Sequence, residues 1–204
     1  MYARVAAFEN RDMSRADELI GIVQERARSG QELPDLRRLL MLVDRRAGTA
    51  LGISFFDTEE AIARAEPAFD KMADEIPESL RGRRTAVGVY EVAIEDVAEG
   101  ARAARVSSLE GAPDRIDEGI HFIKEQILPE AHDLTGWRGV IALVDRAAGR
   151  TKTITLWDSD ESLRASEERA SQLRGEAAEA LGESITGVDR YEVAVHEVLA
   201  AATT

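Results

Sequence analysis

Two kinds of hydrophobic periodicity alternate along the first hundred residues. In residues 50–56 large apolar side chains alternate with Gly52 and Ser54, and this period of two is typical of a strand. Elsewhere apolar residues recur at helical spacing, which predicts amphipathic helices over residues 16–27 and 59–76. Short apolar runs predict the other strands, at residues 2–8, 36–43 and 85–94. The resulting order, β-α-β-β-α-β, is that of the ferredoxin-like motif.

The same pattern occurs a second time, 101 residues later and without a gap. Residues 42–45 (Leu-Val-Asp-Arg) recur at 143–146, and residues 90–93 (Tyr-Glu-Val-Ala) recur at 191–194. Self-similarity at a fixed shift is typical of a duplicated structural unit. The sequence therefore predicts two ferredoxin-like halves in one chain. Their expected bounds are residues 1–95 and 103–198, with a linker at 96–102 and a C-terminal tail at 199–204.

Local signals support these elements. Thr58 and Ser159 stand where a side-chain oxygen caps the second helix of each half. Gly48 and Gly149 end the short turns that precede the third strands, as expected in hairpins that require positive φ. Pro67 falls inside the second helix of the first half and predicts a break or kink there.

Composition and charge restrict the possible partners. The formal net charge is −13 and no cluster of Lys and Arg is present, which argues against binding to a nucleic-acid backbone. No run of 18 apolar residues predicts a membrane span, and residues 1–10 show the pattern of a strand rather than that of a signal peptide. The chain has no cysteine, so disulfides and thiolate metal sites are excluded. We expect a cytoplasmic protein without a metal site.

Each third strand carries a row of small or polar residues that ends in an aromatic residue. Gly52 and Ser54 lead to Phe56, and Thr153 and Thr155 lead to Trp157. If this row faces the interior of a barrel, it leaves room for a cavity with an aromatic wall, whereas the alternative is an ordinary filled core. Further candidate contributors are Trp137 as a wall residue, and Asn10, Tyr90 and Tyr191 as polar groups that are the candidates for catalysis.

Arg4 and Arg105 occupy equivalent positions on the first strand of each half. Because the first strand neighbours the last in this topology, we expect cross-strand ion pairs with Glu91 and Glu192. The alternative interpretation is that each arginine grips an anionic substrate inside the barrel.

The combination resembles the dimeric α+β barrel superfamily, specifically antibiotic-biosynthesis-monooxygenase-like domains, here as a tandem fusion. The residues that carry the resemblance are the segments 55–61 and 156–162, the Tyr-Glu-Val sequences at 90–92 and 191–193, and Pro67. The resemblance implies a pseudo-dimeric α+β barrel that works without a cofactor. It does not extend to the haem-degrading members: Asn10 matches their asparagine, but neither residues 57–80 nor residues 158–181 contain a histidine that could ligate iron.

Three functional hypotheses follow from the resemblance. The first is a cofactor-independent monooxygenase acting on a small aromatic or polyketide-like molecule. The second is a non-catalytic binding or stress-associated protein that holds a small ligand, and the third is a structural module that forms higher oligomers, such as a further homodimer. Asn10 has no equivalent in the second half, while Trp137 and Trp157 replace Leu36 and Phe56, so any site is expected to be single or asymmetric.

Overall fold

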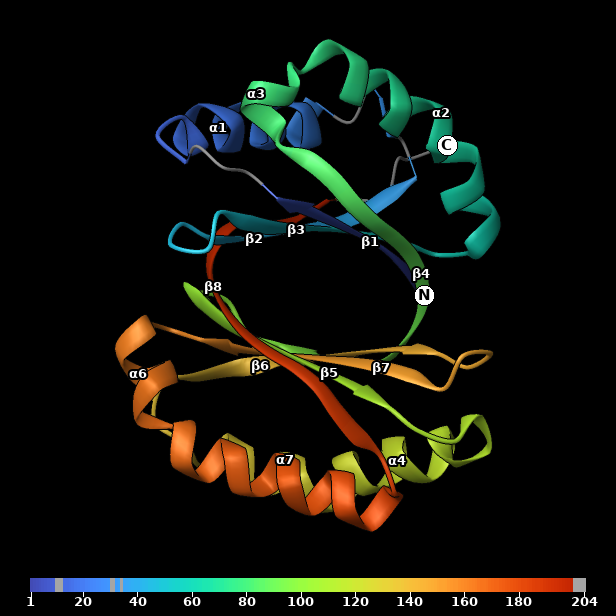
Figure 1. Ribbon diagram of the computed structural model, residues 1–204, viewed down its shortest axis with the longest axis vertical. Coiled ribbons are helices and arrows are strands. Elements are labelled where there is room, and N and C mark those ends of the chain that lie inside the picture. Colours follow the sequence, from blue (N-terminus) through green and yellow to red (C-terminus); the bar gives the residue numbers. More distant parts are fainter. Residues whose placement is uncertain (10–12, 30–31, 34, 200–204) are drawn as a thin grey trace. The chain divides into compact units, whose positions relative to one another are not determined.

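The computed structural model describes the chain except for residues 10–12, 30–31, 34 and 200–204. The elements of the first stretch follow the expected order (Figure 1): β1 (Tyr2–Glu9), α1 (Ala16–Ser29), β2 (Leu36–Asp44), β3 (Thr49–Phe56), α2 (Glu59–Glu75), α3 (Glu78–Arg81) and β4 (Arg83–Val97). The second stretch repeats the order with more interruptions: β5 (Ala103–Glu110), η1 (Pro113–Arg115), α4 (Ile116–Phe122), η2 (Ile123–Ile127), α5 (Leu128–His132), β6 (Trp137–Asp145), β7 (Arg150–Trp157), α6 (Asp160–Ala165), α7 (Glu167–Leu181) and β8 (Ser184–Val198).

The chain forms two compact units. The first unit comprises Met1–Tyr90 with Val193–Thr204, and the second unit comprises Glu91–Glu192. The long strands β4 and β8 are each divided between the two units. Hydrogen-bonded neighbours follow the closed order β1-β3-β2-β8-β5-β7-β6-β4, the connectivity of an eight-stranded antiparallel barrel. The α+β class is thus confirmed, and the pairing of two sequence halves as a pseudo-dimer remains a prediction.

In the first unit, β3 is the middle strand and pairs antiparallel with β1 and β2. The register places Arg4 beside Ser54 and Ala6 beside Gly52. Helices α1, α2 and α3 cover one face of this sheet (Figure 1), and the core between them includes Leu19, Met41 and Ile62.

In the second unit, β7 is the middle strand and pairs with β5 and β6. Arg105 lies beside Thr155 on β7 and, on its other side, beside Arg190 on β8. The helical segments from α4 to α7 pack on one face of this sheet, where Trp157 and Leu163 are fully buried.

Most local predictions are confirmed. Thr58 and Ser159 cap α2 and α6 by accepting hydrogen bonds from the backbone three residues on. Gly48 and Gly149 have φ of 68° and 65° in the two hairpins.

The break considered at Pro67 is absent, whereas the kink that was its alternative stays a prediction. Helix α2 is continuous through Pro67, and the corresponding break occurs instead in the second unit, where Ser166 separates α6 from α7. The last strand of the first stretch is also longer than expected, since β4 continues to Val97, inside the predicted linker. Among the described residues, none of the helices combines the length and apolar character that crossing a lipid bilayer requires.

Candidate functional site

The row of small residues on each third strand faces the helices of its own unit. Gly52 and Ser54 line a cavity between the sheet and helices of the first unit, and Thr153 and Thr155 line one in the second unit. The condition that this row faces a barrel interior is therefore not met, because each row lines a cavity on the helix-covered face. Of the aromatic residues that end the rows, Trp157 lines its cavity and Phe56 does not. Alternate residues of a pleated strand point to the same face of the sheet, and for each row it is the face on which the helices pack.

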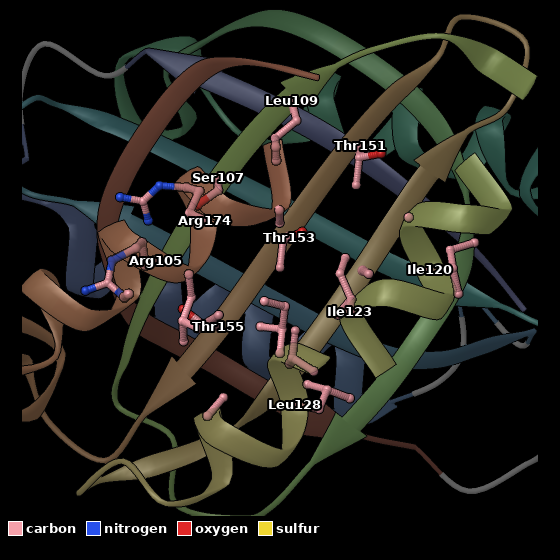
Figure 2. A pocket seen from close by; sticks show the side chains of 18 of the residues that line it. Arg105, Ser107, Leu109, Ile120, Ile123, Leu128, Thr151, Thr153, Thr155 and Arg174 are labelled. Atoms are coloured by element: carbon pink, nitrogen blue, oxygen red, sulfur yellow. The ribbon is translucent and has the colours of Figure 1, made fainter. Parts of the chain in front are cut away.

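The cavity of the second unit has a volume of about 110 Å³. Figure 2 shows its polar side chains on one side, with Arg105 and Arg174 together at one end and Thr151, Thr153 and Thr155 in a row along β7. Apolar side chains of the helical segments close the other side, among them Ile120, Ile123 and Leu128. A dry cavity of about 150 Å³ binds a benzene molecule, so this space is on the scale of a single six-membered ring.

Two tryptophans form an aromatic wall of this cavity. Trp137 and Trp157 both line it, and their rings meet edge to face with centroids 5.5 Å apart. The indole Nε1 of Trp157 donates to Thr155 Oγ1 at 3.1 Å. Trp157 is 1% exposed, so its orientation is fixed by packing and by this hydrogen bond.

Arg105 enters from β5 and is 1% exposed. Its Nη2 donates to the carbonyl of Leu163 at 2.8 Å, to Ser166 Oγ at 3.2 Å and to Glu167 Oε2 at 3.0 Å. The break between α6 and α7 creates these acceptors, because it frees the Leu163 carbonyl from continuous helical bonding. All the side-chain hydrogen bonds of Arg105 within the described chain start from one nitrogen, Nη2.

The remaining two nitrogens of Arg105 are orphaned. Nε and Nη1 are buried and donate to none of the described residues. Leaving a buried donor unsatisfied costs about 1–3 kcal/mol, more for a charged group, so natural structures rarely keep such groups without a use.

Glu167 is shared among three arginines. It lies 3.0 Å from Arg105, 3.5 Å from Arg174 and 2.6 Å from Arg190. Burial opposes ionisation of Glu167, but the hydrogen bond from Arg190 and the nearby positive charges outweigh it and lower the pKa of this carboxyl. Burial also disfavours the charged form of Arg105, and here it lowers the pKa. The attraction to Glu167 opposes this lowering, whereas the repulsion from Arg174 and Arg190 adds to it. The cluster therefore carries more positive than negative charge.

The first unit has a related cavity of about 180 Å³ with a different electrostatic arrangement. Here Arg4 Nε and Nη2 donate to the two carboxylate oxygens of Glu66 at 2.7 and 3.1 Å. The guanidinium also stacks 4.2 Å from the centroid of Phe69. Arg4 is thus neutralised by a two-pronged ion pair. Of the other arginines that line this cavity, Arg26 pairs with Glu32 and Glu75, Arg84 pairs with Asp70, and Arg81 donates to backbone carbonyls.

The expected partners of the two arginines are wrong. Arg4 and Arg105 pair with glutamates on the helices, not with Glu91 and Glu192 on the last strands, because both arginine side chains point to the helix-covered face. Glu91 instead binds Arg146, whose hydrogen bond lowers the pKa of the Glu91 carboxyl.

The other candidate residues divide between the cavities and their surroundings. Phe56 is fully buried and packs edge to face on Phe69, without lining the cavity itself. Tyr90 and Tyr191 lie on β4 and β8 and are not among the described side chains that line either cavity. Asn10 lies outside the described residues.

Sequence reasoning missed the glutamates. Glu66 and Glu167 each follow their arginine by 62 residues and are themselves related by the shift of 101. The available signal was an oppositely charged pair that is present in both stretches under the shift of 101 residues.

A third glutamate, Glu183, lines the second unit's cavity at the opposite end of β5 from Arg105. Burial raises the pKa of the Glu183 carboxyl above its ordinary value of 4.5, and the charge of Arg115 offsets part of this. Its side chain passes close to Gly111, where a Cβ would lie 2.7 Å from Glu183 Cγ.

This raised pKa predicts that Glu183→Gln stabilises the protein at neutral pH. A carboxyl whose pKa is higher in the folded than in the unfolded state binds more protons when folded, so its ionisation destabilises the fold as pH rises above 4.5. We expect the melting temperature of the variant to exceed that of the parent at pH 7 and the difference to vanish below pH 4. Glu118→Gln is the control of opposite sign, because the hydrogen bond from Arg115 lowers the pKa of Glu118. A Glu183→Gln variant less stable at pH 7 would contradict the argument.

Comparisons with known proteins place the fold. No family model matches the chain. The sequence is 29% identical over 150 residues to the uncharacterized protein Rv2557 of Mycobacterium tuberculosis, covering 71% of this chain. It is 28% identical over 174 residues to the uncharacterized protein Rv2558 of the same organism, covering 81% of this chain and 71% of that protein. The match spans 66% of the length of Rv2557.

Solved structures resemble the chain over nearly its whole length. An anthrone oxidase-like protein has a TM-score of 0.68 at 13% identity, covering 99% of this chain and 94% of its own. A candidate monooxygenase from Lactobacillus acidophilus NCFM scores 0.64 at 11% identity, covering 97% and 95%. A ferredoxin-fold protein related to antibiotic biosynthesis monooxygenases, from Listeria monocytogenes, scores 0.55 at 8% identity, covering 94% of both chains. The chain therefore has the α+β fold of monooxygenase-like proteins.

Proposed function

We propose that the second unit binds a small aromatic molecule in its sheet–helix cavity and oxygenates it without a cofactor. The observation that carries the proposal is an apolar cavity with a two-tryptophan wall, at whose end a buried guanidinium keeps two donors unused. Such a site combines an apolar, ring-sized space with a group that stabilises developing negative charge on oxygen.

The chemistry suited to this arrangement is the oxygenation of a phenol to a quinone. One oxygen atom of O₂ enters the ring and the other leaves as water, so the substrate supplies all the electrons. The ring must first become electron-rich by losing its hydroxyl proton. Arg105 would favour that ionisation by hydrogen bonding to the phenolate oxygen.

The size of the cavity restricts the substrate. At about 110 Å³ the cavity matches a single ring and not the three fused rings of an anthrone. Anthrone is considered because the anthrone oxidase-like protein has a similar fold. We therefore expect single-ring phenols to bind and anthrone not to.

The test uses the tryptophans as reporters. The chain contains two tryptophans, and both line this cavity, so occupation by a phenol should change the intrinsic fluorescence. We expect saturable changes with phenol and hydroquinone, none with anthrone, and oxygen consumption that accompanies binding. Trp137→Leu, which restores the residue found at Leu36, should lower the affinity because it removes half of the aromatic wall.

The outcomes separate the alternatives. Saturable binding without oxygen uptake would leave a non-catalytic ligand-binding protein. A fluorescence spectrum that no ring compound alters would overturn the proposal and favour the structural module.

A further inference from the structure

The two units place the same ion pair in different surroundings. Arg4–Glu66 and Arg105–Glu167 occupy repeat-equivalent positions on the first strand and second helical region. In the first unit the pair is closed by two hydrogen bonds, whereas in the second unit a single bond joins Glu167 to Arg105. Because the two residue types are the same in both units, the difference in hydrogen bonding must come from the residues around each pair.

Two further arginines supply that cause. Arg174 and Arg190 both bind Glu167, and the corresponding residues of the first unit are Ala73 and Val89. Arg190 alone donates from Nε and Nη2 to Glu167 Oε2, at 3.1 and 2.6 Å. The single negative charge of Glu167 is thereby shared among three arginines and neutralises Arg105 only in part.

A third replacement removes the aromatic cover. Phe69, on which Arg4 stacks, corresponds to Ala170, which lines the second unit's cavity. Arg105 keeps a looser contact with an aromatic ring, 5.6 Å from the centroid of Trp157. The two added arginines and the missing phenylalanine together leave the guanidinium of Arg105 with fewer hydrogen bonds to its glutamate and a more distant aromatic ring than Arg4 has.

The charges at this end of the cavity do not cancel. In the first unit Glu66 meets Arg4, and the other cavity arginines Arg26 and Arg84 have carboxylate partners of their own. In the second unit three arginines share the single carboxylate of Glu167, so this cluster of four side chains holds two positive charges in excess. Two of the three are well shielded from water, with side-chain exposures of 1% for Arg105 and 13% for Arg174. Buried charge without a partner is costly, and an anion bound beside Arg105 would offset it.

From this arrangement we infer that the Arg105 end of the second unit's cavity binds the carboxylate of a small aromatic acid. The inference rests on the proposed function for the presence of a ring and adds the anionic group. A carboxylate fits the excess charge because it is already ionised at neutral pH, whereas a phenol is not. As an ionised acceptor it also forms a stronger hydrogen bond than a neutral phenol with an orphaned donor of the guanidinium, either Nε or Nη1, which lie on different edges of this planar group. The ring would lie along the threonine row against Trp157.

The test is calorimetric titration of the full chain with benzoate and with benzamide, its uncharged counterpart of the same size. A charge-assisted hydrogen bond predicts benzoate to bind roughly ten- to hundredfold more tightly. Arg105→Met should abolish this preference. Arg174→Ala combined with Arg190→Val should also abolish it, although Arg105 is retained, because Glu167 can then close the pair as Glu66 does. Arg4→Met, the matched change in the first unit, should leave the affinity for benzoate unchanged.

Two results would overturn the inference: equal affinities for benzoate and benzamide, or benzoate binding that survives Arg105→Met. Folding of each variant is checked by its circular dichroism, and the double variant keeps the test valid if Arg105→Met fails to fold. Benzamide and phenol that bind without any preference for benzoate would leave the proposed function standing and the anion site disproved. Failure of every ring compound to bind would disprove both.

Discussion

Replacing Trp157 with alanine should cost about 3–5 kcal/mol of unfolding free energy, the range for truncating a buried large aromatic residue. Trp157 is 1% exposed and packs against Ala103, Leu163 and the edge-on ring of Trp137. Truncation would enlarge the cavity and remove the donor to Thr155 Oγ1. For a chain of this length the melting temperature should fall by roughly 6–20 °C. Denaturant unfolding followed by circular dichroism measures the change.

The matched control is Trp157→Phe, because phenylalanine already occupies the equivalent position, as Phe56. Phenylalanine keeps the aromatic packing and loses one ring and one hydrogen bond, so we expect a cost of about 1–2 kcal/mol. An alanine variant that lost less than the phenylalanine variant would show that this wall does not support the fold.

What the sequence predicted well depends on neighbours along the chain. Thr58 and Ser159 cap helices through bonds spanning three residues, and the glycines at the hairpins need only their own φ angles. The hydrophobic periodicity, which is similar in the two stretches related by the shift of 101 residues, also predicted the element order. In each case the physical cause lies within a few residues, which a single sequence displays.

The pairing of Arg105 could not be predicted in the same way. Its partner lies 62 residues away on a helix, and selecting it requires knowing which face of the sheet the helices cover. The strand alternation separates Thr153 and Thr155 from their neighbours but does not say which set meets the helices. The cross-strand alternative, Glu192, was equally acceptable until the sheet face was known.

The asymmetry of the site was visible only in part. The exchange of Leu36 and Phe56 for Trp137 and Trp157 pointed to the second unit from the sequence. The exchange of Ala73 and Val89 for arginines was equally visible, but its meaning depends on three side chains converging on Glu167. Such a convergence is a property of the packed helix and sheet.

Gly139→Ala should destabilise the second unit through the backbone rather than the core. Gly139 pairs with Val97 across β4 and β6 and has φ of +130°, a conformation that side-chain-bearing residues rarely adopt. A Cβ at this position would lie 2.7 Å from Val97 Cα and would also overlap the carbonyl of Asp96. Backbone strain together with displacement of β4 should cost about 3 kcal/mol. The expected readout is a lower denaturation midpoint and faster amide exchange in residues 94–97.

Gly175→Ala provides the opposite control in the same unit. Gly175 lies within α7, and a Cβ there would meet no atom within 4 Å. Alanine should therefore stabilise the helix by about 0.5–1 kcal/mol, because it loses less backbone entropy on folding. If Gly139→Ala and Gly175→Ala shifted the denaturation midpoint in the same direction, the positive φ of Gly139 and its close approach to β4 would not explain why a glycine is needed there. Opposite shifts would show that the pairing of β4 with β6 depends on the absence of a side chain at that position.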